Sequence, residues 1–409
     1  MRYGVGVDVS KGKSTIAIID ENMVLQMKVF EVEHNLKDMP KLIEILEKYG
    51  KENIKIVMEE TGNYHLPIYK YLTQEGFEVI KENAFKINKY LDREIRKSKT
   101  DKKDAKKLGE YVIENWTKLQ KKEEEEEIYE KLRFLSRQYT SKVDVQRKLK
   151  VDLSNLCDVI FPGYYDLIDD DNIEVALDLL KMFYHSDIVK NLTEEEVIKK
   201  IEDTYKEKEH KRMAKNFGRK IHSLSQICIP SYEVSDQIQL AVESTVNCLK
   251  EVLKATNSII SEMEKIAREL PEYEEIKKTP GIGDVLASRV IAEIGDPKKF
   301  KNAGSIIAYA GIDSPTYQSG NKNVEGIKIS KRGNKYLRRV GYEIMLSIKR
   351  LKENKREGNV IYEYMVKKEN EGKSKKVAKI AGLNKFLKRY YGMIKRIYKE
   401  EIESKGNAA

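Results

Sequence analysis

The residues best suited to chemistry lie in one short segment, residues 99–105 (KTDKKDA). Asp101 and Asp104 are three residues apart, so in a helix their side chains share one face. Two carboxylates on one face repel each other unless a cation lies between them. An Asp near a helix N-terminus is also favourable by itself, because it meets the positive end of the helix dipole. This pair alone therefore leaves a solvated helix start as an alternative to a metal site.

Two further acids follow predicted strands of the same region. Asp8 ends the strand that begins at Tyr3, and Glu59 ends the strand at 54–58. Each has a structural explanation of its own, because a strand-end Asp commonly forms a turn or caps a helix, and Glu59 with Glu60 could be a polar strand terminus. In open α/β sheets, however, sites form beyond the carboxyl ends of strands. Four carboxylates converging there would require cations, and two Mg²⁺ ions about 4 Å apart form the clamp used in phosphodiester cleavage.

The elements that must position these acids follow from the hydrophobic pattern of the first 118 residues. Alternating and continuous apolar runs predict strands at 3–8, 14–19, 23–31, 54–58 and 77–80. Apolar stripes at helical spacing predict helices at 36–49, 64–75, 84–91 and from the 99–105 segment through Ile113. Strands followed by alternating helices and strands predict a mixed sheet with helices on its faces.

The middle of the chain is predicted to be a long helical region. After a charge run at 121–127, apolar residues step by three or four from Ile128 to Leu156, and a second stripe runs from Val242 to Leu270. Two such helices can pair within one chain as an antiparallel hairpin or between chains as a coiled coil. The residue pattern leaves both arrangements open.

The last part of the chain suggests a second site. The turn Gly281-Ile282-Gly283 precedes an apolar helix, and its backbone N–H groups could hold a phosphate in a helix-hairpin-helix-like element. Further on, Ser319 stands beside a glycine in a loop, and a serine of this kind can attack phosphorus if cations stabilise the transition state. The candidate phosphate-binding cations are Lys331, Arg332, Lys335, Arg338 and Arg339. Generic nucleic-acid affinity is the alternative for them.

Composition favours a nucleic-acid partner. The 409 residues carry 77 Lys and Arg against 67 Asp and Glu, a formal net charge of +10, and such an excess favours a polyanion. The three cysteines have no paired spacing for zinc or a disulfide framework, which is typical of a reduced cytosolic protein. We expect no signal peptide and no membrane span, because the chain begins directly with a strand and contains no 18-residue apolar run.

Three segments together resemble a known family. They are residues 6–11 (GVDVSK), 58–64 (MEETGNY) and the 99–105 segment, and they are similar to the DEDD transposases of the IS110 group of insertion sequences and its IS1111 relatives. The resemblance implies an RNase H-like N-terminal domain, akin to Holliday-junction resolvases, with Asp8, Glu59, Asp101 and Asp104 as its acidic tetrad. The family has a small residue where this chain has Glu60, so Glu59 is preferred over Glu60 by alignment. The order of motifs around Gly281–Gly311 and Gln318-Ser319-Gly320 resembles the C-terminal domain of the same family.

The resemblance also implies a mechanism and partners. Ser319 is implied to attach covalently to DNA, while the tetrad binds two Mg²⁺ ions, for which Mn²⁺ can substitute. The implied partners are donor DNA, target DNA and a non-coding bridge RNA that pairs with both. A homo-oligomer, dimer or tetramer, in the cytoplasm at the nucleoid is implied as well.

We therefore predict three domains and one leading function. Residues 1–118 form an α/β RNase H-like catalytic domain, 119–275 a helical or coiled-coil region, and 276–409 a mostly α-helical transposase domain with the candidate serine. The function is that of a DNA transposase or recombinase. The alternatives are a Holliday-junction-type nuclease that uses metal alone, and an inactive nucleic-acid-binding scaffold.

Overall fold

A computed structural model describes the chain except residues 60–62, 83, 92–99, 121–125, 206–209, 315–317, 320–321, 324–327 and 407–409. The side chains of 84, 85, 210, 211, 318, 319, 322, 323 and 400–406 are also outside the description. The chain divides into two compact units, Met1–Glu124 and Glu125–Ala409. They are called unit 1 and unit 2 below, and each is described by itself.

Unit 1 is built on a mixed sheet, as predicted. Its strand order is β3-β2-β1-β4-β5, where β1 pairs antiparallel with β2 and parallel with β4. The strands are β1 (Tyr3–Ser10), β2 (Lys13–Asp20), β3 (Phe30–Glu33), β4 (Ile54–Glu59) and β5 (Val79–Glu82). The tight turn from β1 to β2 places Gly12 at φ 78°, a left-handed conformation that glycine adopts without strain.

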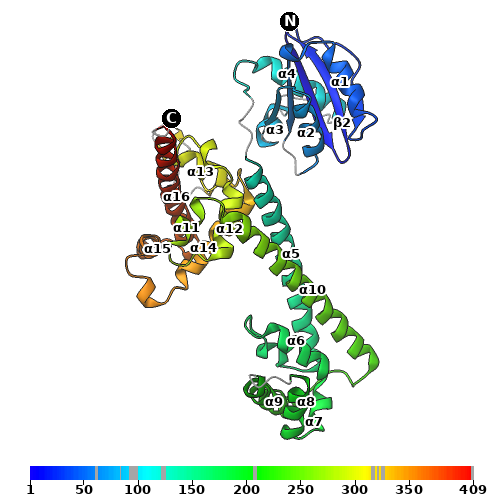
Figure 1. The fold of residues 1–409 in the computed structure, drawn as a ribbon, viewed down its shortest axis with the longest axis vertical. Helices are drawn as coiled ribbons and strands as arrows, with labels where there is room; N and C mark the ends of the chain where they lie inside the picture. The colour runs from blue at the N-terminus through cyan, green and yellow to red at the C-terminus, as the bar shows by residue number, and fades with distance from the viewer. Residues whose placement is uncertain are drawn as a thin grey trace. The chain divides into compact units, whose positions relative to one another are not determined.

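Helices cover both faces of this sheet (Figure 1). They are α1 (Met39–Glu47), η1 (Lys51–Asn53), α2 (Leu66–Gln74), α3 (Ala84–Leu91) and α4 (Asp101–Glu114). Val5, Val7 and Met58 belong to the core shared with α1 and α2. Val57 and Ile80, which point the opposite way, belong to the core shared with α3 and α4. Side-chain alternation along the strands therefore assigns each residue to one of two helical layers.

Helix α4 packs unusually close to β1 because glycines line the contact. A Cβ atom built on Gly6 would lie 2.0 Å from the Ala105 carbonyl oxygen, and one on Gly4 would lie 2.4 Å from that of Gly109. There is no space for a Cβ atom on Gly109 either, since it would lie 2.7 Å from a side-chain carbon of Ile19. This close packing fixes the height of α4 above the sheet.

Unit 2 is mostly helical and contains two long helices, α5 (Glu127–Ile160) and α10 (Asp236–Ala267). They pack along each other (Figure 1). Leu132 shares one core with Met263, and Leu153 shares another with Val246, so the two helices run antiparallel. The intrachain hairpin, one of the two arrangements predicted, is therefore present. Helix α5 ends before Pro162-Gly163, where Gly163 has φ 86°.

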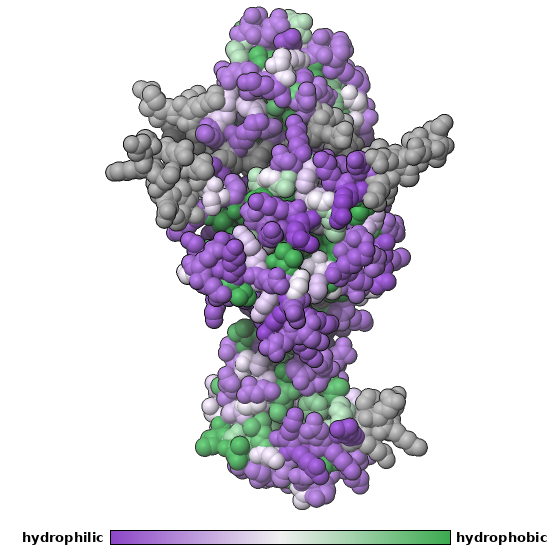
Figure 2. All heavy atoms as spheres, turned by 90° about the vertical axis from the view of Figure 1, so that its left-hand side faces the viewer, coloured by the Kyte–Doolittle hydropathy of each residue, from purple (hydrophilic) through white to green (hydrophobic). Residues whose placement is uncertain are grey.

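Smaller elements gather at the two ends of this hairpin. Those between the long helices surround the Leu153 core: η2 (Tyr164–Leu167), α6 (Ile173–Met182), α7 (Ser186–Lys190), α8 (Glu194–Thr204) and α9 (His210–Ile227). Figure 2 shows hydrophobic residues gathered on the visible face of this region, among otherwise hydrophilic surface. The exposed apolar side chains from the end of α9 to the start of α10 include Ile227, Ile229 and Tyr232.

The remaining elements follow α10, and the α-helices among them contribute to the Leu132 core. They are α11 (Glu272–Lys277), α12 (Asp284–Ile294), η3 (Pro297–Lys299), α13 (Ala303–Ala310), β6 (Gln318–Ser319), β7 (Lys322–Asn323), α14 (Lys335–Lys349), η4 (Glu353–Lys355), α15 (Val360–Asn370) and α16 (Lys375–Gly406). Tyr129 and Leu132 belong to this core although they precede residue 275. The three-domain division with boundaries at 118 and 275 stays a prediction. In the part of the chain that is described, no helix is both long and apolar enough to cross a membrane.

Candidate active site

Asp8 and Glu59 lie side by side at the carboxyl edge of the sheet. The last registered pair of β1 and β4 is Val7 with Met58, so each acid follows directly after it. Successive side chains of a strand point to opposite faces of the sheet, and Val7 and Met58 belong to the core on the α1 and α2 side. Asp8 and Glu59 therefore point to the other face, which α4 covers. Both side chains are half-buried. The strand register therefore places these two predicted site residues together.

The first turn of α4 lies over the same edge. The Thr100 side chain caps this helix by accepting a hydrogen bond from the Lys103 backbone N–H at 3.4 Å. Because Gly6 contacts the helix at Ala105, the turn before Ala105 extends toward Asp8, two residues further along β1. Asp104 is buried and Asp101 is exposed. Both acids of the 99–105 segment thus belong to the face and edge that hold Asp8 and Glu59.

The surroundings of Lys13 give independent support for this placement. Lys13 begins β2 opposite Ser10, at the same edge. Its pKa is raised mainly by the hydrogen bond to Glu31, 2.8 Å away, and also by the charge of Asp101. Asp101 is therefore within electrostatic range of the strand ends.

A fifth carboxylate, Glu82, lies at this edge and was not singled out from the sequence. Glu82 pairs with Glu59 in the register of β4 and β5, is buried, and forms an ion pair with Lys86 at 2.8 Å. The strand was predicted at 77–80, whereas β5 covers Val79–Glu82. Extending the predicted strand by two residues would have revealed this acid.

The donor types at the edge fit a divalent cation, since Mg²⁺ prefers carboxylate oxygens. Among the residues that the structure describes, however, no three His, Cys, Asp or Glu side chains converge closely enough to hold a metal ion. Glu60, the alternative to Glu59, lies outside the described residues. The fit therefore rests on donor chemistry and backbone placement rather than on a formed coordination cluster.

The candidate serine is carried by a loop whose base is well defined. The Ser330 hydroxyl donates to the Asp313 carboxylate at 2.6 Å, and the Ser330 backbone N–H donates to the Asp313 carbonyl at 2.8 Å. Within the loop, the backbone of Ser319 pairs with Lys322 in the antiparallel β6–β7 ladder. The Ser319 side chain lies outside the description. Its role as a nucleophile stays a prediction.

Two of the predicted phosphate-binding arginines are engaged inside the protein. Arg338 donates to the carbonyls of Ala310 and Gly333, each at 2.9 Å, and burial lowers its pKa. Arg339 forms a bidentate ion pair with Asp144 of α5, with both N···O distances 2.8 Å. The hydrogen bonds from Arg339 hold the pKa of Asp144 below its usual value. Both arginines thus have structural roles that the sequence did not reveal.

The remaining candidate cations lie at the surface near the base of the loop. Lys331, Arg332 and Lys335 are exposed, and Lys331 has φ 55°. The Lys335 ammonium also lies 5.1 Å from the ring centre of Tyr336. Their positions suit contact with a polyanion better than those of Arg338 and Arg339 do.

The two turn glycines before α12 differ from each other. Gly281 has φ 93°, and a Cβ atom there would lie 3.0 Å from a side-chain carbon of Ile348, so backbone conformation and tight packing together favour glycine. Gly283 is the N-cap of α12, and a Cβ atom on it would meet nothing within 4 Å. Asp284, the first residue of α12, is paired with Lys277 at 2.7 Å. Phosphate binding by this turn stays a prediction, with Gly283 the better-placed residue.

Taken together, an α/β unit with acids at one sheet edge and a helical unit with a basic surface define a protein of the nucleic-acid-processing type. Comparison with known families makes this specific. A model of DEDD transposases of the IS110 group, described as transposase, matches residues 5–162. A second, described as the transposase IS116/IS110/IS902 family, matches residues 273–358. The chain belongs to the IS110 family of transposases.

Two curated relatives agree with this assignment. A Coxiella burnetii transposase for insertion sequence element IS1111A is 31% identical over 101 residues, which is 24% of this chain and 28% of the relative. A Streptomyces coelicolor protein, named as a mini-circle transposase for IS117, is 35% identical over 78 residues, which is 19% of each chain. The chain thus matches less than a third of either relative's length.

Proposed function

We propose that this chain is a DNA transposase or recombinase that cuts and rejoins DNA strands. The single observation that carries the proposal is the placement of the first turn of α4, with Asp101 and Asp104, over the strand ends that bear Asp8 and Glu59. The strand order, in which only β2 runs against the others, supports an RNase H-like unit 1. In this role Asp8, Glu59, Asp101 and Asp104 hold divalent metal, with Mg²⁺ the ion best suited to carboxylate donors.

Bound metal would supply a Lewis acid that stabilises charge on the phosphate and on the attacking and leaving oxygens. The chain's own contribution is to hold the four carboxylates in place, which the close contact of α4 with β1 achieves. The two strand-end acids are half-buried and Asp104 is buried, so their charges are only partly screened by water. Such a site has a strong requirement for cations.

Ser319 is proposed as the nucleophile that attaches covalently to DNA. Its oxygen forms a bond to phosphorus while the bond from phosphorus to one sugar oxygen breaks, and that oxygen takes up a proton. The second family model spans this serine. The exposed Lys331, Arg332 and Lys335 follow the base of its loop and can offset the negative charge of the phosphate.

The partners are proposed from the same family membership. They are donor and target DNA, a non-coding bridge RNA, and further copies of the chain in a dimer or tetramer, acting at the nucleoid in the cytoplasm. The proposed division of unit 2 into a helical middle, 119–275, and a transposase domain, 276–409, belongs to this picture. The long α5–α10 hairpin is the element on which we propose that copies associate.

A covalent-adduct assay tests the mechanism. The protein is incubated with labelled donor and target DNA, the RNA encoded by its element, and Mg²⁺. We expect a protein–DNA adduct that is lost in Ser319→Ala and kept in the control Ser314→Ala, whose serine is exposed five residues earlier. Cleavage that persists in Ser319→Ala without an adduct would indicate a metal-dependent nuclease, and binding without cleavage would indicate a scaffold.

A second pair of variants tests the acids. Asp101→Asn should abolish strand cleavage, because a neutral amide is a poor substitute for a carboxylate ligand. The matched control is Asp38→Asn, since Asp38 is the N-cap of α1 and forms a surface ion pair with exposed Lys41 at 2.9 Å. Full cleavage by Asp101→Asn, at Mg²⁺ concentrations that support the parent protein, would contradict the metal assignment.

A further inference from the structure

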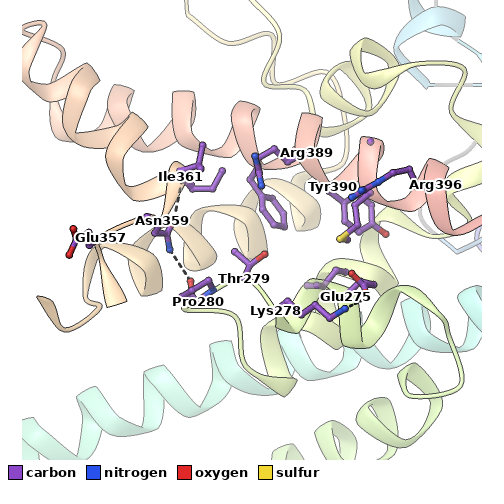
Figure 3. A pocket seen from close by; sticks show the side chains of 16 residues that line it. Glu275, Lys278, Thr279, Pro280, Glu357, Asn359, Ile361, Arg389, Tyr390 and Arg396 are labelled. Carbon is purple, nitrogen blue, oxygen red and sulfur yellow. Dashed lines mark hydrogen bonds and ion pairs between the residues drawn. The ribbon is translucent and has the colours of Figure 1, made fainter. Parts of the chain in front are cut away.

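A pocket of about 660 Å³ opens in unit 2, and none of the residues that line it is assigned above to catalysis. It lies between the turn that joins α11 to α12, the start of α15, and the exposed face of α16 (Figure 3). Its volume is within the range of roughly 300–1,000 Å³ that small-ligand sites occupy.

The floor of the pocket is apolar and aromatic. Ile276, Ile361, Phe386 and Tyr390 line it and are all buried. The rings of Phe386 and Tyr390 lie 6.3 Å apart and are inclined by 31°. The Tyr390 hydroxyl is buried and has no hydrogen-bond partner among the described residues. A flat group with polar edges suits such a floor better than an aliphatic one does.

The rim is basic on the side of α16. Arg389 and Arg396 are seven residues apart and therefore share one face of the helix. Both are exposed, and neither makes an ion pair or hydrogen bond with any residue that the structure describes. Lys278, across the opening, is already paired with Glu275. Glu357 lies at the other end of the pocket, so the two arginines dominate the charge at this side (Figure 3).

Gly392 keeps the space between these arginines open. It is an exposed glycine within helix α16, where glycine is less favourable than alanine. A Cβ atom on Gly392 would meet nothing within 4 Å, and its φ is not in the left-handed region. Neither packing nor backbone conformation therefore requires glycine here, whereas an unobstructed pocket does.

We propose that this pocket binds one unpaired nucleotide of a nucleic-acid strand. The base enters the apolar floor beside Phe386 and Tyr390, and the adjoining phosphate lies between the guanidinium groups of Arg389 and Arg396. A bare phosphate would leave the aromatic floor unused, and an apolar ligand would leave the two arginines unused. The proposal rests on the proposed function only in taking the polyanion to be nucleic acid.

Binding of short strands to the full chain tests this proposal. Fluorescent ten-residue oligo-dT and oligo-rU, and AMP as a free nucleotide, are titrated by fluorescence anisotropy or competition. EDTA is present, so that the acids of unit 1 do not contribute through metal. The double variant Arg389→Ala/Arg396→Ala should weaken strand binding roughly 10- to 100-fold, as expected when charge-assisted hydrogen bonds are lost.

The matched control is Lys388→Ala/Lys395→Ala, which removes the same charge from exposed positions one residue before each arginine. An equal loss in both double variants would show general electrostatic attraction and overturn the pocket. If the arginine double variant loses binding of oligo-dT and oligo-rU alike, the pocket accepts both DNA and RNA. If it loses binding of only one of them, the pocket is specific for that nucleic acid. Binding of AMP alone, with no strand binding, would overturn the proposal.

Gly392→Leu separates binding from folding. The new side chain fills the mouth of the pocket without meeting described atoms at its Cβ, so the thermal midpoint should stay equal or rise while strand binding falls. Unchanged binding in this variant refutes the pocket. Strands with 5-iododeoxyuridine should also crosslink to segment 386–396 on irradiation, and crosslinks confined to other segments would contradict it. Because no readout involves cleavage, failure here leaves the adduct assay unaffected.

Discussion

Gly6 sets the distance between α4 and the sheet, and replacing it should disturb both stability and chemistry. A Cβ atom on Gly6 would lie 2.0 Å from the Ala105 carbonyl oxygen, whereas real Cβ contacts are essentially never under 3.0 Å. Gly6→Ala must therefore displace the α4 backbone by about 1 Å at least. Overpacking of this kind costs about 1–3 kcal/mol. A 1 Å displacement of Asp101 and Asp104 should lower strand cleavage roughly 100-fold.

The assay can follow unit 1 separately, because the chain has a single tryptophan, Trp116, directly after α4. Its ring lies 5.2 Å from the Lys55 ammonium and 5.7 Å from the Arg2 guanidinium, so its fluorescence should change when α4 leaves the sheet. For Gly6→Ala we expect the urea midpoint to fall by about 1–2 M.

Gly76→Ala provides the matched control. Gly76 has φ 85°, but a Cβ atom there would meet nothing within 4 Å. This variant should lose about 1 kcal/mol from backbone strain and keep its cleavage activity. A Gly6→Ala protein with an unchanged midpoint would refute the packing argument. One that is destabilised yet cleaves normally would refute the idea that α4 positions the site.

Two further predictions concern unit 2. Burial raises the pKa of Glu272, although hydrogen bonds from Tyr129 (2.8 Å) and Tyr398 (3.1 Å) oppose the shift. The contribution of Glu272 to stability should therefore be full below the ordinary carboxyl pKa and should be lost as pH rises through the raised value. Glu272→Gln should remove this dependence in urea melts followed by circular dichroism from pH 4 to 8, and a retained slope would assign it to another group. Gly281→Ala should lower the thermal midpoint by several degrees, from a cost of about 1–3 kcal/mol, because φ 93° and the contact with Ile348 both exclude a side chain; an unchanged midpoint with weakened DNA binding would instead support the phosphate-binding role.

Much of unit 1 could be predicted because its pattern is local. The apolar run at residues 3–8 predicted a strand, and β1 is present there. The third strand was predicted at 23–31, but β3 covers only Phe30–Glu33, with an isolated bridge at Leu25. Met23 has φ 62°, and its backbone closes a turn with Asp20, so this segment cannot continue a ladder.

The candidate site of unit 2 was harder to predict than the fold of unit 1, because its contacts join segments that are far apart in the sequence. Residue type alone made Arg339 a phosphate-binding candidate, yet its partner Asp144 lies 195 residues away on α5. The nucleotide pocket joins the α11–α12 turn to α16 in the same way. The helix stripes starting at Ile128 and Val242 were periodic and long, and α5 and α10 confirm them.

The pinned base of the Ser319 loop has a further consequence for how reactants meet. Ser319 is six residues beyond Asp313, and a chain spans at most about 3.5 Å per residue, so its reach from the pin is about 20 Å. Confinement to a sphere of that radius corresponds to an effective concentration on the order of tens of millimolar. In the proposed mechanism, a strand held near Asp313 would therefore meet Ser319 as a tethered reactant, and the number of residues between Asp313 and Ser319 would set the upper limit of their separation.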